Sequence, residues 1–153
     1  MSIRKSTLVK LLLLVGLFSW YYVTHHKYTD EVYGCDIKLH MSFMEFNNAN
    51  VIQALKALKY ASKDGYREVC NNVDEMFLNM SCGGFQGGCY YNRPNEIHVS
   101  TAHDQFLGWT AAIIVHEACH SKQRNEGRPL SEDECYQRTH ETLIDLVEHE
   151  HSI

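Results

Sequence analysis

The distribution of apolar positions divides the chain into an N-terminal hydrophobic segment and a mixed remainder. From Leu8 to Val23 the sequence is almost continuously apolar, and basic residues precede it. This pattern predicts one helix with a positively charged flank, as in export signals and membrane anchors. Residues 24–34 are polar and are expected to form a short tether. We therefore expect an N-terminal segment over residues 1–24 and one domain over residues 25–153.

The N-terminal segment can be interpreted as a cleaved signal or as a retained anchor. A cleavage site needs small residues at its −3 and −1 positions, but Gly16, Ser19 and Thr24 each follow a bulky residue two positions earlier. The sequence therefore favours an anchor over residues 7–23, about 25 Å of helix. The positive flank then places the N-terminus in the cytoplasm and the domain in the periplasm or outside the cell. A cleaved segment would instead leave a secreted domain.

Beyond residue 34, segments with strand periodicity alternate with segments of helical periodicity. Residues 35–43 and 96–100 alternate as strands do, while residues 66–80 fit either element. Helices are predicted from Asn47 or Asn48 to Gly65, over 105–121 before the break at Gly127, and over 130–147. The mixture predicts an α+β fold.

Composition and charge narrow the class of protein. The chain is 44% hydrophobic and 22% charged with two prolines, which excludes collagen, low-complexity disorder and a polytopic membrane protein. Residues 11–153 carry 11 basic and 19 acidic side chains, a net charge of −8. A domain this acidic is not expected to bind nucleic acid.

All six cysteines lie beyond residue 30, on one side of the apolar segment. No two of them form a Cys-x-x-Cys pair, so a zinc ribbon is not expected. An even number of cysteines in an exported domain predicts disulfide bonds formed in an oxidising compartment.

The candidate chemistry lies near the end of the predicted helix over 105–121, where His116, Glu117 and His120 form the pattern H-E-x-x-H. On a helix the two histidines are one turn apart on the same face, so both imidazoles can bind one metal ion. Glu117 lies beside them and can polarise a metal-bound water. The preceding turn is apolar, and Trp109 and Ile113 continue the histidine face, which indicates a helix that emerges from the core.

The segment resembles the active-site helix of the zinc metallopeptidases called zincins. It lacks the continuation of the metzincins, which would need Gly at Gln123 and His at Glu126. It is similar instead to the gluzincins, and in size to the single-domain minigluzincins, over about residues 96–147. The resemblance implies a small zincin-like domain fold with the strand at 96–100 along the edge of the substrate cleft, and a glutamate on the downstream helix as third zinc ligand.

The resemblance also implies a reaction, the hydrolysis of peptide bonds. A zinc-activated water would attack the carbonyl, with Glu117 as general base and later as proton donor to the leaving amine. Zinc peptidases commonly add a donor for the developing oxyanion. Tyr136 and His140 on the downstream helix are the candidates.

Two glutamates of the downstream helix could be the third ligand. Counting about 100° per residue, Glu132 falls on the apolar side that includes Tyr136 and Leu143, whereas Glu134 falls nearly opposite. Ser131 and Glu134 also form the pattern of a capping box, which gives Glu134 a structural role. Glu132 is therefore predicted as the ligand, with Glu134 as the alternative. Several gluzincins have Asp four residues after the ligand, where this chain has Tyr136.

Once the two ligand-bearing helices are expected to meet at the metal, a pairing of the cysteines follows. Among the 15 possible connectivities, a Cys119–Cys135 bond would join those helices, and a buried free thiol at Cys119 is the alternative. Cys82–Cys89 and Cys35–Cys70 are the remaining pairs.

Two functions are compatible with these observations. The first is a membrane-anchored zinc metallopeptidase that acts on a peptide or protein. The alternative is a disulfide-stapled, non-catalytic binding or scaffold module on a zincin-like fold. The presence of Glu117 favours the enzyme, because a binding module has no need of a general base beside the zinc.

Overall fold

The structure is a computed structural model and describes residues 5–40, 48–79, 81–82, 87–100 and 107–151. Its elements follow one another as α1 (Lys5–His25), β1 (Lys27–Asp30), β2 (Cys35–His40), α2 (Ala49–Ala61), α3 (Lys63–Asn72), β3 (Glu75–Leu78), β4 (Gly88–Cys89), β5 (Glu96–Val99), α4 (Leu107–Asn125) and α5 (Glu132–His151). The molecule is mixed α and β, which confirms the coarse fold class expected from the sequence.

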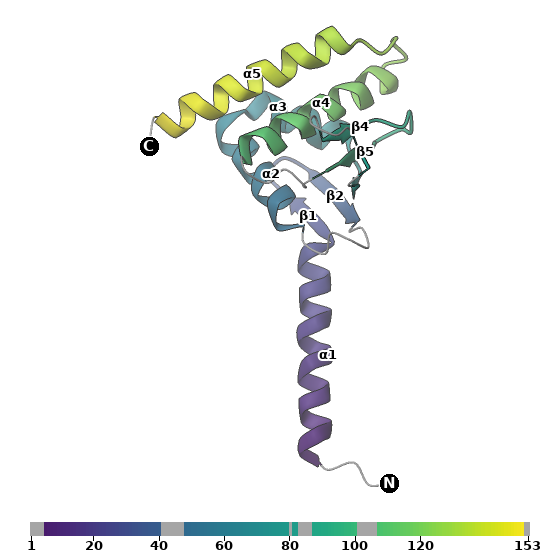
Figure 1. The fold of residues 1–153 in the computed structure, drawn as a ribbon, viewed down its shortest axis with the longest axis vertical. Helices are drawn as coiled ribbons and strands as arrows, with labels where there is room; N and C mark the ends of the chain where they lie inside the picture. Colours follow the sequence, from purple (N-terminus) through teal and green to yellow (C-terminus); the bar gives the residue numbers. More distant parts are fainter. Residues whose placement is uncertain (1–4, 41–47, 80, 83–86, 101–106, 152–153) are drawn as a thin grey trace.

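Helix α1 confirms the predicted N-terminal helix and projects away from the rest of the molecule (Figure 1). Its large apolar side chains between Leu8 and Trp20 are exposed. Within the part of the chain that the structure describes, no helix combines the length and the apolar character needed to cross a membrane. The choice between an anchor and a cleaved signal stays a prediction.

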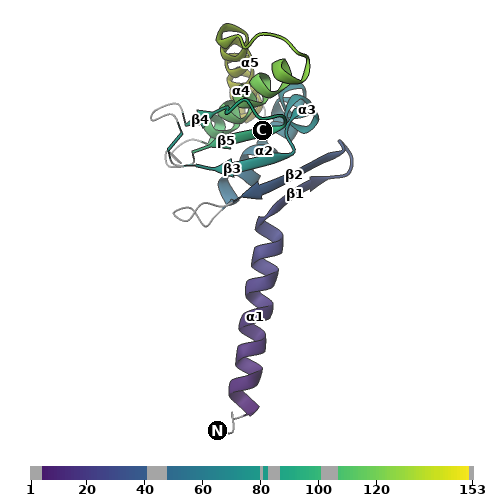
Figure 2. The ribbon, with the colours of Figure 1, turned by 90° about the vertical axis from the view of Figure 1, so that its right-hand side faces the viewer.

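The strands form a five-stranded sheet in the described residues, ordered β1-β2-β3-β5-β4. The three central strands β2, β3 and β5 are parallel, and β1 and β4 pair antiparallel at the two edges. Alternate residues of the central strands are buried, and helices α2 to α5 lie on that side of the sheet (Figure 2).

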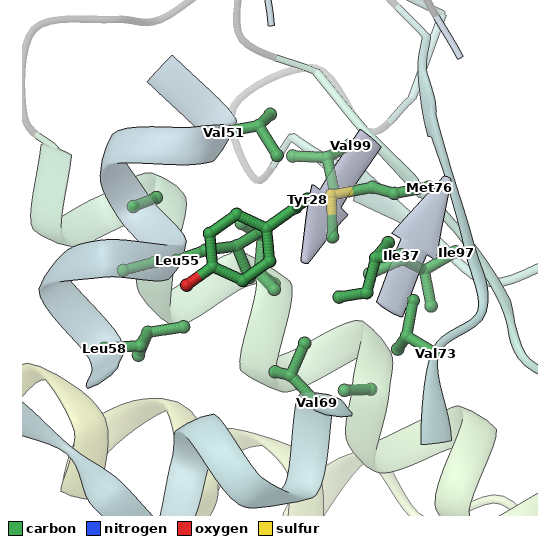
Figure 3. Close-up of a cluster of buried hydrophobic side chains, with 14 of the residues drawn as sticks. Tyr28, Ile37, Val51, Leu55, Leu58, Val69, Val73, Met76, Ile97 and Val99 are labelled. Carbon is green, nitrogen blue, oxygen red and sulfur yellow. The ribbon is translucent and has the colours of Figure 1, made fainter. Parts of the chain in front are cut away.

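The core lies between the buried face of the sheet and the helices (Figure 3). Ile37, Met76 and Ile97 from the central strands are fully or almost fully buried, as are Leu55 of α2 and Val69 of α3. Helix α4 is buried on nearly all sides from Thr110 to Ser121, because it packs against α2, α3, α5 and the sheet at once. The histidine pair therefore belongs to a helix that is packed against other elements on nearly all sides.

Two sequence predictions about local structure are corrected. The tether expected over residues 24–34 contains β1, because Tyr28 and Asp30 alternate with exposed residues and are buried. Gly65 does not end a helix but lies inside α3, since the chain breaks earlier, between α2 and α3 at Ser62. A Cβ on Gly65 would lie only 3.2 Å from Val115 and 3.3 Å from Thr142, so glycine allows α3 to approach α4 and α5 closely.

The remaining elements agree more closely with the sequence. The segment 66–80, which fitted either element, contains the rest of α3 and then β3, and its last residue lies outside the described residues. Asn48 precedes α2 as expected, but its side chain makes no capping hydrogen bond, and Asn47 lies outside the described residues. Gly127 adopts φ of +67°, a conformation that favours glycine, and ends the α4 region as predicted.

All three predicted disulfides are present, which confirms the expected pairing. Cys35–Cys70 joins β2 to α3, and Cys82–Cys89 closes the loop that leads into β4. Cys119–Cys135 joins α4 to α5 with a Cα–Cα distance of 5.5 Å. Closing a loop of this length restricts the unfolded chain by about 3 kcal/mol, and the bond fixes the start of α5 against the histidine helix.

Candidate metal centre and catalytic site

The two histidines of α4 lie side by side at the surface of the core. Their ring centroids are 4.9 Å apart, and the side chain of His120 is almost completely buried. Burial lowers the pKa of His116, and the neighbouring His120 lowers it further. A lowered pKa favours the neutral imidazole, which is the form that binds metal ions.

Glu132, the first residue of α5, brings a carboxylate to this pair. Its Oε2 is 3.3 Å from His116 Nε2, and its Oε1 is 3.3 Å from His120 Nε2. One ligand atom from each of the three residues fits within 4.8 Å of the others. A tetrahedral zinc ion separates its ligand atoms by about 3.3 Å, and the two histidine-to-glutamate distances are close to this value. The three residues are therefore a candidate metal site.

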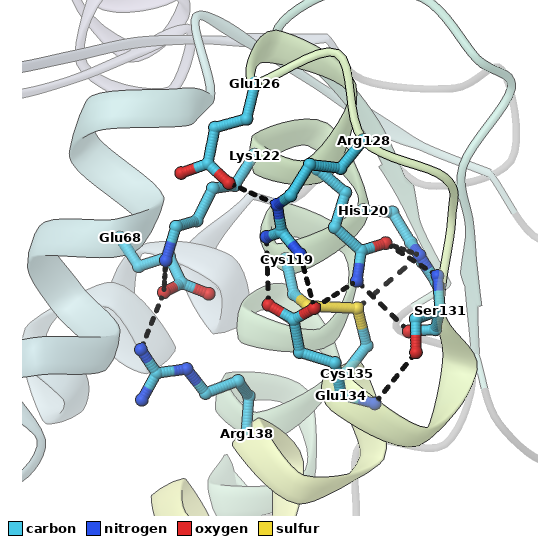
Figure 4. A network of polar contacts seen from close by, with 11 residues as sticks. Glu68, Cys119, His120, Lys122, Glu126, Arg128, Ser131, Glu134, Cys135 and Arg138 are labelled. Atoms are coloured by element: carbon cyan, nitrogen blue, oxygen red, sulfur yellow. Dashed lines mark hydrogen bonds and ion pairs between the residues drawn. A yellow bond between two sulfur atoms is a disulfide. The ribbon is translucent and has the colours of Figure 1, made fainter.

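Glu134 lies elsewhere in the structure, in a network around the turn between α4 and α5 (Figure 4). Arg128 donates two hydrogen bonds to its carboxylate, at 2.8 and 3.0 Å, and the Gln123 amide donates a third at 3.1 Å. These bonds, with Arg128 as the main contributor, lower the pKa of Glu134 to about 2. Only half of the predicted capping box forms: Ser131 Oγ accepts from the Glu134 amide at 3.4 Å, while Ser131's own amide bonds Gln123.

The structure thus brings Glu132, and not Glu134, to the histidines. The argument from helix phase is wrong about exposure, because it placed Glu132 on the buried side of the helix and Glu134 on the solvent side. The Glu132 side chain is 64% exposed, more than the 35% of Glu134. Glu132 reaches the imidazoles because the histidines lie at an open cleft beside the first turn of α5. Its role as a ligand stays a prediction.

Glu117 is the most unusual group of the site. It is only 5% exposed, and its Oε2 is buried without a hydrogen-bond partner among the described residues. Burial raises its pKa to about 8, and repulsion from Glu132 adds to the effect. A buried polar atom without a partner is unfavourable for folding, so its presence calls for a functional explanation.

The first residue of β4, Gly88, packs against this carboxyl group. Gly88 lies so close that a Cβ at its position would be 2.8 Å from Glu117 Cδ. Only glycine therefore fits between the edge of the sheet and the general-base candidate. The expectation that the strand at 96–100 forms the edge of the cleft is corrected, because β4 lies outside β5 in the sheet and carries Gly88.

Two adjoining cavities open at the site, and both include Gly88, His116, Glu117 and Tyr136 in their walls. The smaller cavity, about 90 Å³, is completed by Trp109, Ile113 and Thr139 and is mainly apolar. The larger and more polar one, about 330 Å³, is completed by Cys89, Tyr90, His120, Leu130 and Glu132.

The two candidate oxyanion donors occupy different places. Tyr136 lines both cavities, and its ring centroid is 4.9 Å from that of His116. His140 is exposed and lines neither cavity. The structure therefore favours Tyr136 as the one that could contact a substrate at the site.

Sequence reasoning missed several residues of the site. Gly88 and Tyr90 come from the glycine-rich loop, whose neighbouring glycines indicated only a turn. Gln123 and Thr139 hydrogen-bond the two histidines. Thr139 lies one turn after Cys135 on α5, a spacing that would have placed it opposite the metal-binding helix once the disulfide was assumed.

Comparison of the chain with known protein families, with characterised proteins and with solved structures finds no match.

Proposed function

We propose that the protein is a zinc-dependent metallopeptidase of the gluzincin type, with His116, His120 and Glu132 as zinc ligands and Glu117 as general base. The observation that carries the proposal is the position of Glu117. A buried carboxyl group with an unpartnered oxygen lies beside two imidazoles that share a third donor. Packing does not require such a group, whereas proton transfer does.

The donor set fits zinc, because two neutral imidazoles and one carboxylate are a known ligand combination for catalytic sites of this metal. A zinc ion bound there would act as a Lewis acid toward a water molecule and a peptide carbonyl. Glu117 lines both cavities and so can accept a proton from a water in either of them. Burial raises the pKa of Glu117 above its ordinary value, which favours return of that proton to a leaving amine.

The surrounding residues suggest how a peptide would bind. Gly88 leaves the backbone of the edge strand β4 next to Glu117, where an extended peptide could run alongside it. The apolar cavity formed by Trp109 and Ile113 would receive a side chain next to the cleaved bond. Three disulfides fit a domain that works outside the cytoplasm, held by or released from the N-terminal segment.

Zinc binding of the purified full-length chain tests the metal site. We expect one zinc per chain, strong loss of zinc in His116→Ala, and at least a tenfold loss of affinity in Glu132→Ala. Glu134→Ala is the matched control, since it lies on the same turn of α5 but bonds Arg128. Stoichiometric zinc in His116→Ala, or a larger loss in Glu134→Ala than in Glu132→Ala, would contradict the site.

Hydrolysis of a diverse peptide mixture, followed by mass spectrometry, tests the activity. The wild-type chain with zinc should cleave peptides, and the chain stripped by a chelator should not. If the zinc-loaded protein cleaves none of the mixture, and Glu117→Gln leaves its function unchanged, the non-catalytic binding module is the better explanation.

A further inference from the structure

We propose that Gln123 and Thr139 are positioning residues that hold His120 and His116 in the tautomer whose Nε2 lone pair faces Glu132. The inference rests on the proposed metal site, and it assigns a role to two residues that the H-E-x-x-H pattern does not contain. Both act on the far nitrogen of an imidazole, Nδ1, and not on the metal itself.

Thr139 fixes the tautomer of His116. The Thr139 hydroxyl donates its single hydrogen to the carbonyl oxygen of Cys135 at 2.9 Å. It can therefore only accept from His116 Nδ1, which lies 3.1 Å away. The His116 ring also hydrogen-bonds the backbone of Cys135. Nδ1 must carry a proton, so in the neutral ring Nε2, which lies 3.3 Å from Glu132, is the nitrogen available to a metal ion.

Gln123 fixes the tautomer of His120, because its own orientation is determined by its neighbours. Its Oε1 accepts from the amide of Ser131 at 3.0 Å, and its Nε2 donates to Ser131 O at 3.2 Å and to Glu134 at 3.1 Å. Turning the amide round would oppose all three bonds. His120 Nδ1, 3.3 Å from Oε1, must therefore donate to Gln123.

A second acceptor supports the same tautomer of His120. Cys135 Sγ lies 3.5 Å from His120 Nδ1, and a sulfur in a disulfide bond has no hydrogen to donate. Both neighbours of Nδ1 are therefore acceptors. The Nε2 atom is left without a proton and lies 3.3 Å from the other oxygen of Glu132.

Gln123 also connects the two helices that supply the ligands. It is fully buried on α4, and it bonds both the amide and the carbonyl of Ser131, the residue directly before Glu132. One side chain thus orients a ligand of α4 and fixes the backbone that carries the ligand of α5. Removing the Gln123 side chain should weaken metal binding in two ways, through the orientation of His120 and through the position of Glu132.

Nitrogen NMR of the metal-free, full-length chain, with labelled histidine, measures the tautomers directly. At a pH of about 8, where imidazoles are neutral, the wild type should show Nδ1–H for both His116 and His120. Thr139→Val should lower the Nδ1–H fraction of His116 alone, and Gln123→Met that of His120 alone, since each ring keeps a second acceptor at Cys135. Each variant should lower zinc affinity about 10- to 100-fold.

Two further variants separate positioning from a general structural effect. Thr139→Ser keeps the hydroxyl and should restore both the tautomer of His116 and the zinc affinity. Ser121→Ala removes a buried hydroxyl of the same helix α4 that bonds Asn72 O, away from the histidines, and should change neither.

The outcomes distinguish this inference from the proposed function. An Nε2–H tautomer in the wild type, or a change of both histidines in each variant, overturns the positioning role even if zinc binds. The expected tautomers in a chain that binds no zinc would contradict the metal site alone.

Discussion

Two of the three buried carboxyl groups in the described part of the chain, Asp30 and Glu117, have opposite surroundings. Asp30, at the end of β1, is 8% exposed, and Glu117 on α4 is 5% exposed. Asp30 Oδ2 accepts from the Tyr66 hydroxyl and from Lys59 Nζ, both at 2.7 Å, and Oδ1 accepts from the amide of Val32 at 3.1 Å. These bonds, with Lys59 as the first contributor, lower the pKa of Asp30.

Glu117 has none of these partners, and its pKa is raised where that of Asp30 is lowered. Burial is the first cause of the raised pKa of Glu117, whereas at Asp30 the hydrogen bonds from Lys59 and Tyr66 outweigh burial. Asp30 joins β1 to α2 and α3 and contributes to stability, whereas Glu117 leaves an oxygen unpaired beside two imidazoles. The difference is that Asp30 has a positively charged partner, whereas Glu117 has neither an ion pair nor a hydrogen bond to Oε2 among the described residues, which makes it the candidate for a proton-transfer role.

The largest expected effect is on hydrolysis by the Glu117→Gln variant. Removing the general base while keeping the shape of the side chain should lower kcat by about 10²- to 10⁴-fold. Zinc content should stay at one per chain, since Glu117 is not among the three donors. Peptide turnover and elemental analysis of the same sample provide the two measurements.

The control for that experiment comes from the other cluster. Tyr66 belongs to the Asp30 network and lines neither cavity. The Tyr66→Phe variant should therefore keep the wild-type kcat at a temperature at which it is folded. A loss of activity in Tyr66→Phe equal to that in Glu117→Gln would show that the two clusters do not have separate roles.

A smaller effect on turnover is expected from Tyr136→Phe. Tyr136 lines both cavities, and loss of its hydroxyl should lower kcat about tenfold or more if it donates to the oxyanion. His140→Ala should change kcat little, because His140 lies outside both cavity walls. Steady-state kinetics of the two variants decides between them, and a larger effect of His140 would place the substrate on the other side of α5.

The sequence predicted the histidine pair and the disulfide beside it, but not the contacts that form only in the packed fold. The H-E-x-x-H spacing predicted His116 and His120 on one face because helical geometry is local. The Cys119–Cys135 bond followed once two helices were expected to meet. The Asp30 cluster could not be predicted, because its members come from three elements and only the packed fold brings them together. The same is true of Gly88, which faces Glu117 across a sheet edge.

Loss of a polar group should destabilise the protein when it is made in the Asp30 cluster, but not when it is made at Glu117. Tyr66→Phe removes a hydroxyl that donates to Asp30 and is bonded by Tyr28 at 2.8 Å. It should lower the free energy of unfolding by about 1–3 kcal/mol, because Asp30 and Tyr28 each lose a buried partner. For a chain of this size the melting temperature should fall by about 2–4 °C per kcal/mol.

Glu117→Gln should not lower the melting temperature of the metal-free chain, since no hydrogen bond of Oε2 is lost. Thermal unfolding of both variants, with disulfides intact, measures the difference. Equal destabilisation by the two substitutions would mean that Glu117 has a structural partner after all.

The smallest effect is a pH dependence that belongs to the Asp30 cluster. Its bonds with Lys59 and Tyr66 lower the pKa of Asp30 below the ordinary value of 3.8. The unfolded chain therefore binds a proton at a higher pH than the folded chain, so the stabilisation is fully present above 3.8 and is lost as the pH falls through the lowered pKa. Asp30→Asn cannot lose a proton and lacks this dependence. The advantage of wild type over Asp30→Asn in urea unfolding should be constant above about pH 5 and shrink between about pH 4 and pH 2; a difference that stays constant to pH 2 would show that Lys59 and Tyr66 do not stabilise the charged carboxylate.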